Sequence, residues 1–273
     1  MPDYYIPLIT AIIIQVGSLF GMFFVFFLVL SKLQKWTQRN YFRSVGWKGI
    51  LWTAWLGTPI HEYSHVIFAK IFRHRIDEVA LFEPNYETGE LGHVNHSYNG
   101  GSLYQNIGIF FIGSAPLIFG SFLLIVLLRF LVPNGEEIFT ALTSDYSIVG
   151  LAEGVRQSFQ LLFSYDNLSN IYFWLFLYLS FCIASHLAPS KADRKGVWYG
   201  LVLILIILIT ANIFLFMVNI DITGYILIVS NWMSISVAVF TYATIISFIH
   251  FLISLVIFLP FKRNPRKMDF FTK

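Results

Sequence analysis

The chain has 273 residues, of which 57% are hydrophobic and 12% are charged, whereas soluble domains carry about 25% charged residues. Its net charge is +3, and the basic side chains lie at the ends of apolar runs rather than on one nucleic-acid-binding face. Composition and charge therefore exclude an ordinary soluble domain and a nucleic-acid-binding protein. They predict an all-α polytopic membrane protein whose constant partner is the lipid bilayer.

The first apolar run covers residues 6–30 and is long enough for one transmembrane helix, which takes about 20 apolar residues. No Lys or Arg precedes it, and it is too long for the hydrophobic region of a signal peptide, so we expect no cleaved leader. Residues 31–48 are basic and rich in aromatic side chains, which is typical of an amphipathic helix at the lipid headgroups. We therefore expect residues 1–47 to form a first span with its interfacial connector.

The second apolar run, residues 48–71, contains the sequence H-E-Y-S-H at residues 61–65. On a helix, His61 and His65 project from one face, so that both imidazoles can reach one metal ion. Glu62 can take a proton from a metal-bound water. Ionisable groups at membrane depth are costly, and a divalent cation supplies a common partner for all three. The motif predicts one Zn²⁺ per chain, with two histidine ligands and a glutamate as general base.

Pro59 stands just before the motif, and it leaves two alternatives open for the backbone. Proline lacks an N–H, so either the helix bends at this point or a new helix begins with Thr58 as its N-cap. In both cases irregular backbone lies beside the motif, where it is tolerated if it lines a cavity.

The most polar part of the chain, residues 73–103, reads as two short strands, Ile76–Phe82 and Gly92–Tyr98, around a turn at Glu83–Gly89. We therefore expect a short membrane-associated β-hairpin near residues 76–98. A free strand edge can pair with an extended substrate segment, which makes the second strand the candidate substrate-binding element, through Gly92, His93, Val94, Asn95 and His96. The two histidines in it point to opposite faces of a strand, so we read them as polar surface residues.

The remaining apolar runs bring the expected total to about six transmembrane helices. They cover residues 103–132, 171–187, 197–218 and 222–261, the last as one long or broken span. Between the first two of these runs, we expect a short amphipathic helix around residues 148–163 on the membrane surface. Cys182 and His250 each stand alone in an apolar run, and we read both as ordinary buried residues.

An even number of spans places both termini on one side of the membrane. The basic C-terminal tail predicts a cytoplasmic C-terminus in a multi-pass protein of the plasma membrane. The basic connector at 31–48 then falls on the opposite side, against the positive-inside rule. A first run that does not fully cross, or a motif run that re-enters, would remove this conflict.

A catalytic zinc needs a third protein ligand and an open position for water. Asp193 is the first choice, because it follows the end of a span on the side where the motif is expected. Its alternative role is structural, since Ser190-x-x-Asp193 resembles a capping box that opens the next helix. His186 is the second choice of ligand, and Glu153 and Asp166 are more remote ones.

In this chain a membrane-embedded H-E-x-x-H is followed by a strand-like polar segment, a small-residue helix and an aspartate at a later helix end. This order of features resembles the site-2 protease family of intramembrane zinc metalloproteases. The resemblance covers roughly residues 48–196, which we take as the metalloprotease core, with 197–273 as C-terminal spans and tail. It implies zinc at His61 and His65, Glu62 as general base and an aspartate that completes the site. The family usually carries that aspartate in Leu-Asp-Gly, whereas this chain contains no Asp-Gly dipeptide.

The sequence thus predicts an intramembrane zinc endopeptidase that cleaves a transmembrane or membrane-proximal segment of a partner protein. One alternative is a membrane metalloprotease with Glu153 as third ligand, acting on interfacial substrates. Another is a metal-binding or helix-binding membrane scaffold that does not cut. Nothing in the sequence specifies an oligomeric state.

Overall fold

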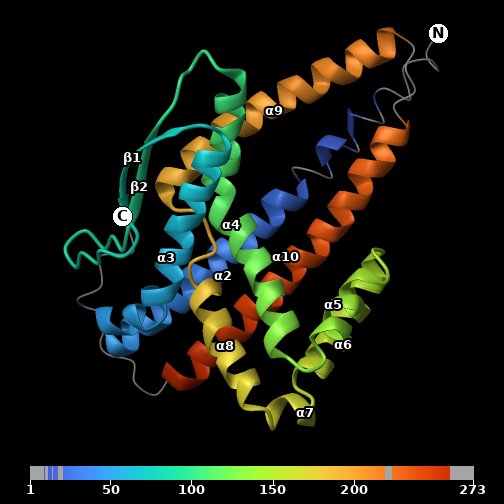
Figure 1. Ribbon diagram of the computed structural model, residues 1–273. Helices are drawn as coiled ribbons and strands as arrows, with labels where there is room; N and C mark the ends of the chain where they lie inside the picture. Colours follow the sequence, from blue (N-terminus) through green and yellow to red (C-terminus); the bar gives the residue numbers. More distant parts are fainter. Residues whose placement is uncertain (1–8, 10–11, 14, 18–20, 219–222, 259–273) are drawn as a thin grey trace.

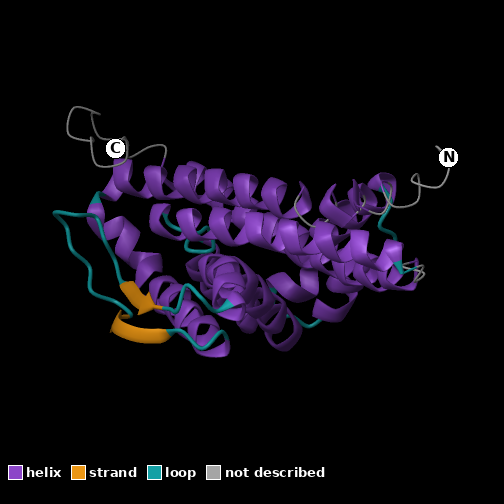
Figure 2. Cartoon of the chain, turned by 90° about the horizontal axis from the view of Figure 1, so that it is seen from above, coloured by secondary structure: helices purple, strands orange, loops and turns teal. Residues whose placement is uncertain are grey.

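The computed structural model describes residues 9–258 with the exception of residues 10–11, 14, 18–20 and 219–222. Long helices make up most of this part of the chain, and a two-stranded antiparallel sheet lies at one edge of them (Figures 1 and 2). The elements are α2 (Met22–Val45), α3 (Trp47–Ile71), β1 (Arg75–Ala80), β2 (His93–Ser97), α4 (Leu103–Leu131), α5 (Gly135–Thr143), α6 (Ile148–Leu162), α7 (Tyr165–Leu168), α8 (Ile171–Ala184), α9 (Lys191–Met217) and α10 (Thr223–Phe258).

Three of these helices are long and apolar enough to cross a bilayer, namely α4, α9 and the part of α10 from Met233 to Val256. The other described helices are shorter, less apolar or more charged. The chain is therefore mostly helical, as its composition predicts, and the larger number of about six spans stays a prediction.

Helix α2 corrects the predicted boundary between a first span and a separate connector. The helix continues without a break from Met22 to Val45 and ends at Gly46, whose φ is 77°. No glycine or proline interrupts it, so the backbone stays helical although the hydropathy falls after residue 30. Its buried residues recur at three- or four-residue spacing and form one face against α3 and α10: Leu30, Leu33, Thr37, Tyr41 and Ser44. The basic stretch is thus half of a packed helix.

Helix α3 resolves the two alternatives that Pro59 leaves open. It runs from Trp47 to Ile71 with Pro59 inside it, so no new helix begins at Thr58. Gly57, one turn before the motif, lies against the end of α8 and the loop that follows it. A Cβ atom at this glycine would lie 2.1 Å from the carbonyl oxygen of Cys182 and 2.4 Å from Nδ1 of His186. Only a residue without a side chain allows this approach.

We expect Gly57→Ala to lower the free energy of unfolding by about 1–3 kcal/mol, the usual cost of forcing an extra group into a packed site. The added methyl group would meet backbone and a ring nitrogen, neither of which can move away cheaply. Thermal unfolding of the purified protein in detergent measures the change. Gly100→Ala is the matched control, because nothing lies within 4 Å of a Cβ at that loop position. Equal stability of the two variants would contradict the close approach.

Helix α4 occupies the centre of the bundle and contacts α3, α8, α9 and α10. Two glycines of this small-residue helix allow close contacts. A Cβ at Gly113 would lie 2.8 Å from the carbonyl oxygen of Asp193, and one at Gly120 would lie 2.4 Å from Cδ2 of Leu187. The absence of side chains at these positions lets the beginning of α9 and the loop before it come close to α4, which itself packs against α3. This packing brings Asp193 near the motif.

The expected hairpin is also confirmed. β1 and β2 pair antiparallel, with Arg75 opposite Ser97 and Ile76 opposite His96, and the register shifts between Ile76 and Glu78. Both strands contact α3. The predicted helix around residues 148–163 is present as α6, and the last apolar run is one helix, α10, over its described residues.

Candidate metal centre

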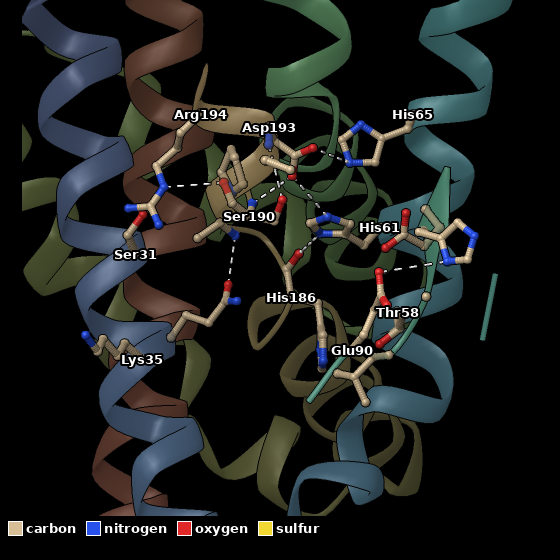
Figure 3. A pocket seen from close by; sticks show the side chains of 18 of the residues that line it. Ser31, Lys35, Thr58, His61, His65, Glu90, His186, Ser190, Asp193 and Arg194 are labelled. Carbon is tan, nitrogen blue, oxygen red and sulfur yellow. Dashed lines mark hydrogen bonds and ion pairs between the residues drawn. The ribbon is translucent and has the colours of Figure 1, made fainter. Parts of the chain in front are cut away.

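Three of the predicted zinc-site residues come together in the structure. His61 and His65 project from α3 toward Asp193 at the beginning of α9 (Figure 3). Nε2 of His61 lies 3.7 Å from Oδ2 of Asp193, and Nε2 of His65 lies 3.5 Å from Oδ1. One ligand atom from each residue falls within 4.8 Å of the others. Ligands of a tetrahedral zinc stand about 3.3 Å apart, given metal–ligand bonds near 2 Å, so small adjustments would let this group hold the ion.

The second ring nitrogen of each histidine is held by a backbone carbonyl. Nδ1 of His61 lies 2.6 Å from the carbonyl oxygen of His186, and Nδ1 of His65 lies 2.8 Å from that of Ile112. A neutral imidazole that donates from Nδ1 carries its lone pair on Nε2, which is the state that binds a metal. Both Nε2 atoms face the carboxylate of Asp193, so the surroundings of the histidines favour metal binding.

Asp193 forms the predicted cap and also faces the two histidines, so the two roles that the sequence left as alternatives are compatible. Its Oδ2 accepts a hydrogen bond of 2.7 Å from the backbone N–H of Ser190, and the Ser190 hydroxyl accepts one of 3.2 Å from the backbone N–H of Asp193. This is the predicted capping box at the beginning of α9. Oδ1 takes no part in the cap and faces His65. The cap therefore fixes the carboxylate in an orientation suited to a ligand.

Glu62 lies beside the two histidines and is 8% exposed. It makes no hydrogen bond or ion pair with any described residue, and its side chain lines a cavity of about 660 Å³. The hairpin passes directly over it, since a Cβ at Gly92 would lie 3.1 Å from Cγ of Glu62 and 2.6 Å from the carbonyl oxygen of Ala80. The carboxylate is thus confined and unpaired, as a proton acceptor for water requires.

The three candidate ligands line one side of this cavity, and two other segments of the chain form two further walls of it. One wall is formed by α2, and the other by the chain from Gly89 to Asn95, which includes the beginning of β2. His186 and Thr58 also line it. Nε2 of His186 and the hydroxyl of Thr58 are buried without a hydrogen-bond partner among the described residues. Buried polar atoms of this kind are usually satisfied by ordered water. The cavity therefore offers room and polar partners for water next to Glu62.

The other candidate ligands lie outside the group. His186 contributes its carbonyl oxygen to His61, while its own Nδ1 lies 3.2 Å from the carbonyl oxygen of Cys182. Glu153 is on the exposed face of α6, where it pairs with Arg156 and accepts a hydrogen bond from Gln157. These partners lower the pKa of the Glu153 carboxyl to about 2. In the part of the chain that the structure describes, neither residue joins His61 and His65 in a metal-binding group, nor does Asp166.

Four of the five candidate substrate-binding residues line the cavity, namely Gly92, His93, Val94 and Asn95. The fifth, His96, points elsewhere, and its Nδ1 lies 3.0 Å from Nδ1 of His74. Burial lowers the pKa of His96, and the neighbouring His74 lowers it further. His96 therefore belongs to the contact between the hairpin and the end of α3.

Three other residues, His250, Cys182 and His93, have the environments that the sequence predicts. His250 is buried, stacks on Phe181 and lies 2.8 Å from the hydroxyl of Tyr41, which makes it a satisfied core histidine as expected. Cys182 is buried and free, also as expected. His93 lies 3.5 Å from Glu78 and is partly exposed, so it is a polar residue at the cavity edge.

Sequence reasoning missed the two carbonyl groups that orient the histidines. Backbone carbonyls occur at every position, so no residue type at Ile112 or His186 could have indicated them. Comparison of the whole chain with protein-family models, with curated proteins and with solved structures gave no match. The assignment of the site therefore rests on the side chains and distances described above.

Proposed function

We propose that the protein is a zinc-dependent intramembrane endopeptidase. The observation that carries the proposal is the meeting of the Nε2 atoms of His61 and His65 with the carboxylate of Asp193, beside Glu62 in the adjoining cavity. Three ligands of this kind plus one open position are the donor set of catalytic zinc sites. A structural zinc site would use four protein ligands and would not need a neighbouring proton acceptor.

A zinc ion bound here would polarise a peptide carbonyl and lower the pKa of a water in its open position. Glu62 would accept the proton of that water on its carboxylate and later deliver it to the leaving amine. Asp193 and the two histidines would stay fixed throughout, because a capping box and two carbonyl contacts hold them. The cavity would admit the water and the scissile segment.

The substrate class follows from the surroundings of the site. The hairpin is a two-stranded sheet, and the beginning of β2 lines the cavity. A substrate strand could pair with β2 through main-chain hydrogen bonds, which would expose its carbonyl groups to the site. Three bilayer-suited helices accompany the site, so we propose a transmembrane or membrane-proximal segment of a partner protein as substrate. We further propose a multi-pass enzyme of the plasma membrane with a cytoplasmic C-terminus.

The proposal predicts that activity follows the zinc content. The purified protein, reconstituted in liposomes with a library of reporter-tagged single-span membrane segments, is expected to cut a subset of them with one zinc per chain. Removal of the metal with a chelator should abolish the cutting, and one equivalent of Zn²⁺ should restore it. Cutting that survives a verified loss of zinc would contradict the mechanism. A zinc-loaded protein that cuts nothing in the library would favour the non-proteolytic scaffold.

A further inference from the structure

The loop between α8 and α9, residues 185–190, connects the parts of the metal centre. It supplies the carbonyl oxygen of His186 that holds His61, and it ends at Ser190, the N-cap that orients Asp193. A displacement of this loop would therefore shift one histidine and the carboxylate together. What holds the loop in place is thus important for the geometry of the centre.

Two side chains of α2 hold this loop by its backbone. Nε2 of Gln38 donates to the carbonyl oxygen of Ser185 at 3.0 Å, and Oε1 of Gln34 accepts from the N–H of Ala188 at 2.8 Å. These are the only hydrogen bonds that the two backbone groups make with described residues. The glutamines are one helical turn apart, so both project from the same face of α2. Both also line the cavity that contains the candidate metal ligands.

We propose that Gln34 and Gln38 are positioning residues of the metal centre. They act through the loop and touch no reacting group. Gln38 fixes the loop immediately before the carbonyl that orients His61, and Gln34 fixes it just ahead of the cap that orients Asp193. Loss of such outer partners typically weakens metal binding by about 10-fold to 100-fold. The inference rests on the metal-binding part of the proposed function and does not depend on proteolysis.

The opposite polarity of the two hydrogen bonds allows a sharp test. Gln34→Glu keeps an oxygen that accepts from the Ala188 N–H, whereas Gln38→Glu replaces the donor to the Ser185 carbonyl by an oxygen. Both variants add one negative charge to the wall of the same cavity, at positions one helical turn apart. We expect zinc affinity, measured by competition with a chelator, to stay within about twofold for Gln34→Glu. For Gln38→Glu we expect it to fall by at least about 10-fold.

Two further measurements separate positioning from general loss of structure. Asn40→Ala removes another polar contact of the same helix, the 2.9 Å bond from Asn40 to the Ser254 hydroxyl on α10, and should leave zinc affinity within about twofold. The absorption spectrum of the Co²⁺-substituted protein should change in Gln38→Glu and stay unchanged in Asn40→Ala, because it reports ligand geometry.

Equal zinc affinities in the two glutamate variants would overturn the proposal, and so would a loss in Asn40→Ala as large as that in Gln38→Glu. Failure of the metal site itself has a different signature, because the unmodified protein would then bind no zinc. If the unmodified protein binds zinc and Gln38→Glu binds it equally well, only the positioning role fails.

Discussion

Glu62→Gln is expected to lower the rate of substrate cleavage by about 100-fold to 10,000-fold, the usual contribution of a general base. The amide has nearly the same size as the carboxylate and fits between the histidines and Gly92, but it cannot accept a proton at neutral pH. Glu62 is not among the grouped ligands, so zinc should remain bound at one ion per chain. Cleavage rate and zinc content are measured on the same preparation.

A second carboxylate provides the control for the Glu62 variant. Glu136 is exposed on α5, pairs with Arg129 at 2.6 Å and does not line the cavity. Glu136→Gln should therefore keep both the cleavage rate and the zinc content of the unmodified protein. If Glu62→Gln cuts at the normal rate with zinc bound, another group must accept the proton and the assignment of the base is wrong.

The motif and the hairpin were predictable because their signals are local. His61, Glu62 and His65 fall within little more than one turn of a helix, so the helical period alone places the two imidazoles on one face. The hairpin follows from a turn sequence between two short strand-forming stretches. Neither inference needs information about parts of the chain that are distant in sequence.

The placement of Asp193, the proposed third ligand, needed both local and distant information. The spacing from Ser190 to Asp193 indicated a cap, and the expected position of a span end indicated a ligand. The sequence presented these roles as competitors, whereas the cap and the approach to the histidines coexist: Oδ2 accepts the cap hydrogen bond and also faces His61, and Oδ1 faces His65. The packing of α9 against α4 at Gly113, which no local pattern indicates, brings the capped end of α9 to His61 and His65.

The boundary of α2 and the glutamine contacts were beyond sequence reasoning. Hydropathy falls after residue 30, and this fall was read as the end of an element, although backbone helicity depends on propensity and not on polarity. The contacts of Gln34 and Gln38 join residues 154 and 147 positions apart. Such pairs leave no periodic signal in a single sequence. The sequence of the basic stretch, residues 31–48, therefore did not indicate that one face of it contacts the loop at residues 185–190.

Asp193→Asn is expected to weaken zinc binding by at least about 100-fold, more than the loss of an outer partner, because it removes the charge of a direct ligand. The amide oxygen can still accept a hydrogen bond from the Ser190 N–H, so the cap and the fold should persist.

Ser190→Ala changes the cap and leaves the carboxylate of Asp193 intact. It removes the hydroxyl of the cap and should cost about 1 kcal/mol of stability, while the carboxylate remains available to the metal. Chelator competition and thermal unfolding of the zinc-free protein measure the two effects separately.

Glu153→Gln is the matched control for Asp193→Asn, because it neutralises the carboxylate that was the alternative third ligand. Glu153 is paired with Arg156 on α6 and lies outside the grouped ligands, so zinc affinity should stay within about twofold. Loss of zinc in Glu153→Gln together with retention in Asp193→Asn would reverse the assignment. Loss of zinc in Asp193→Asn together with retention in Glu153→Gln would support a third ligand at the beginning of α9. That ligand follows directly on the loop that Gln34 and Gln38 hold.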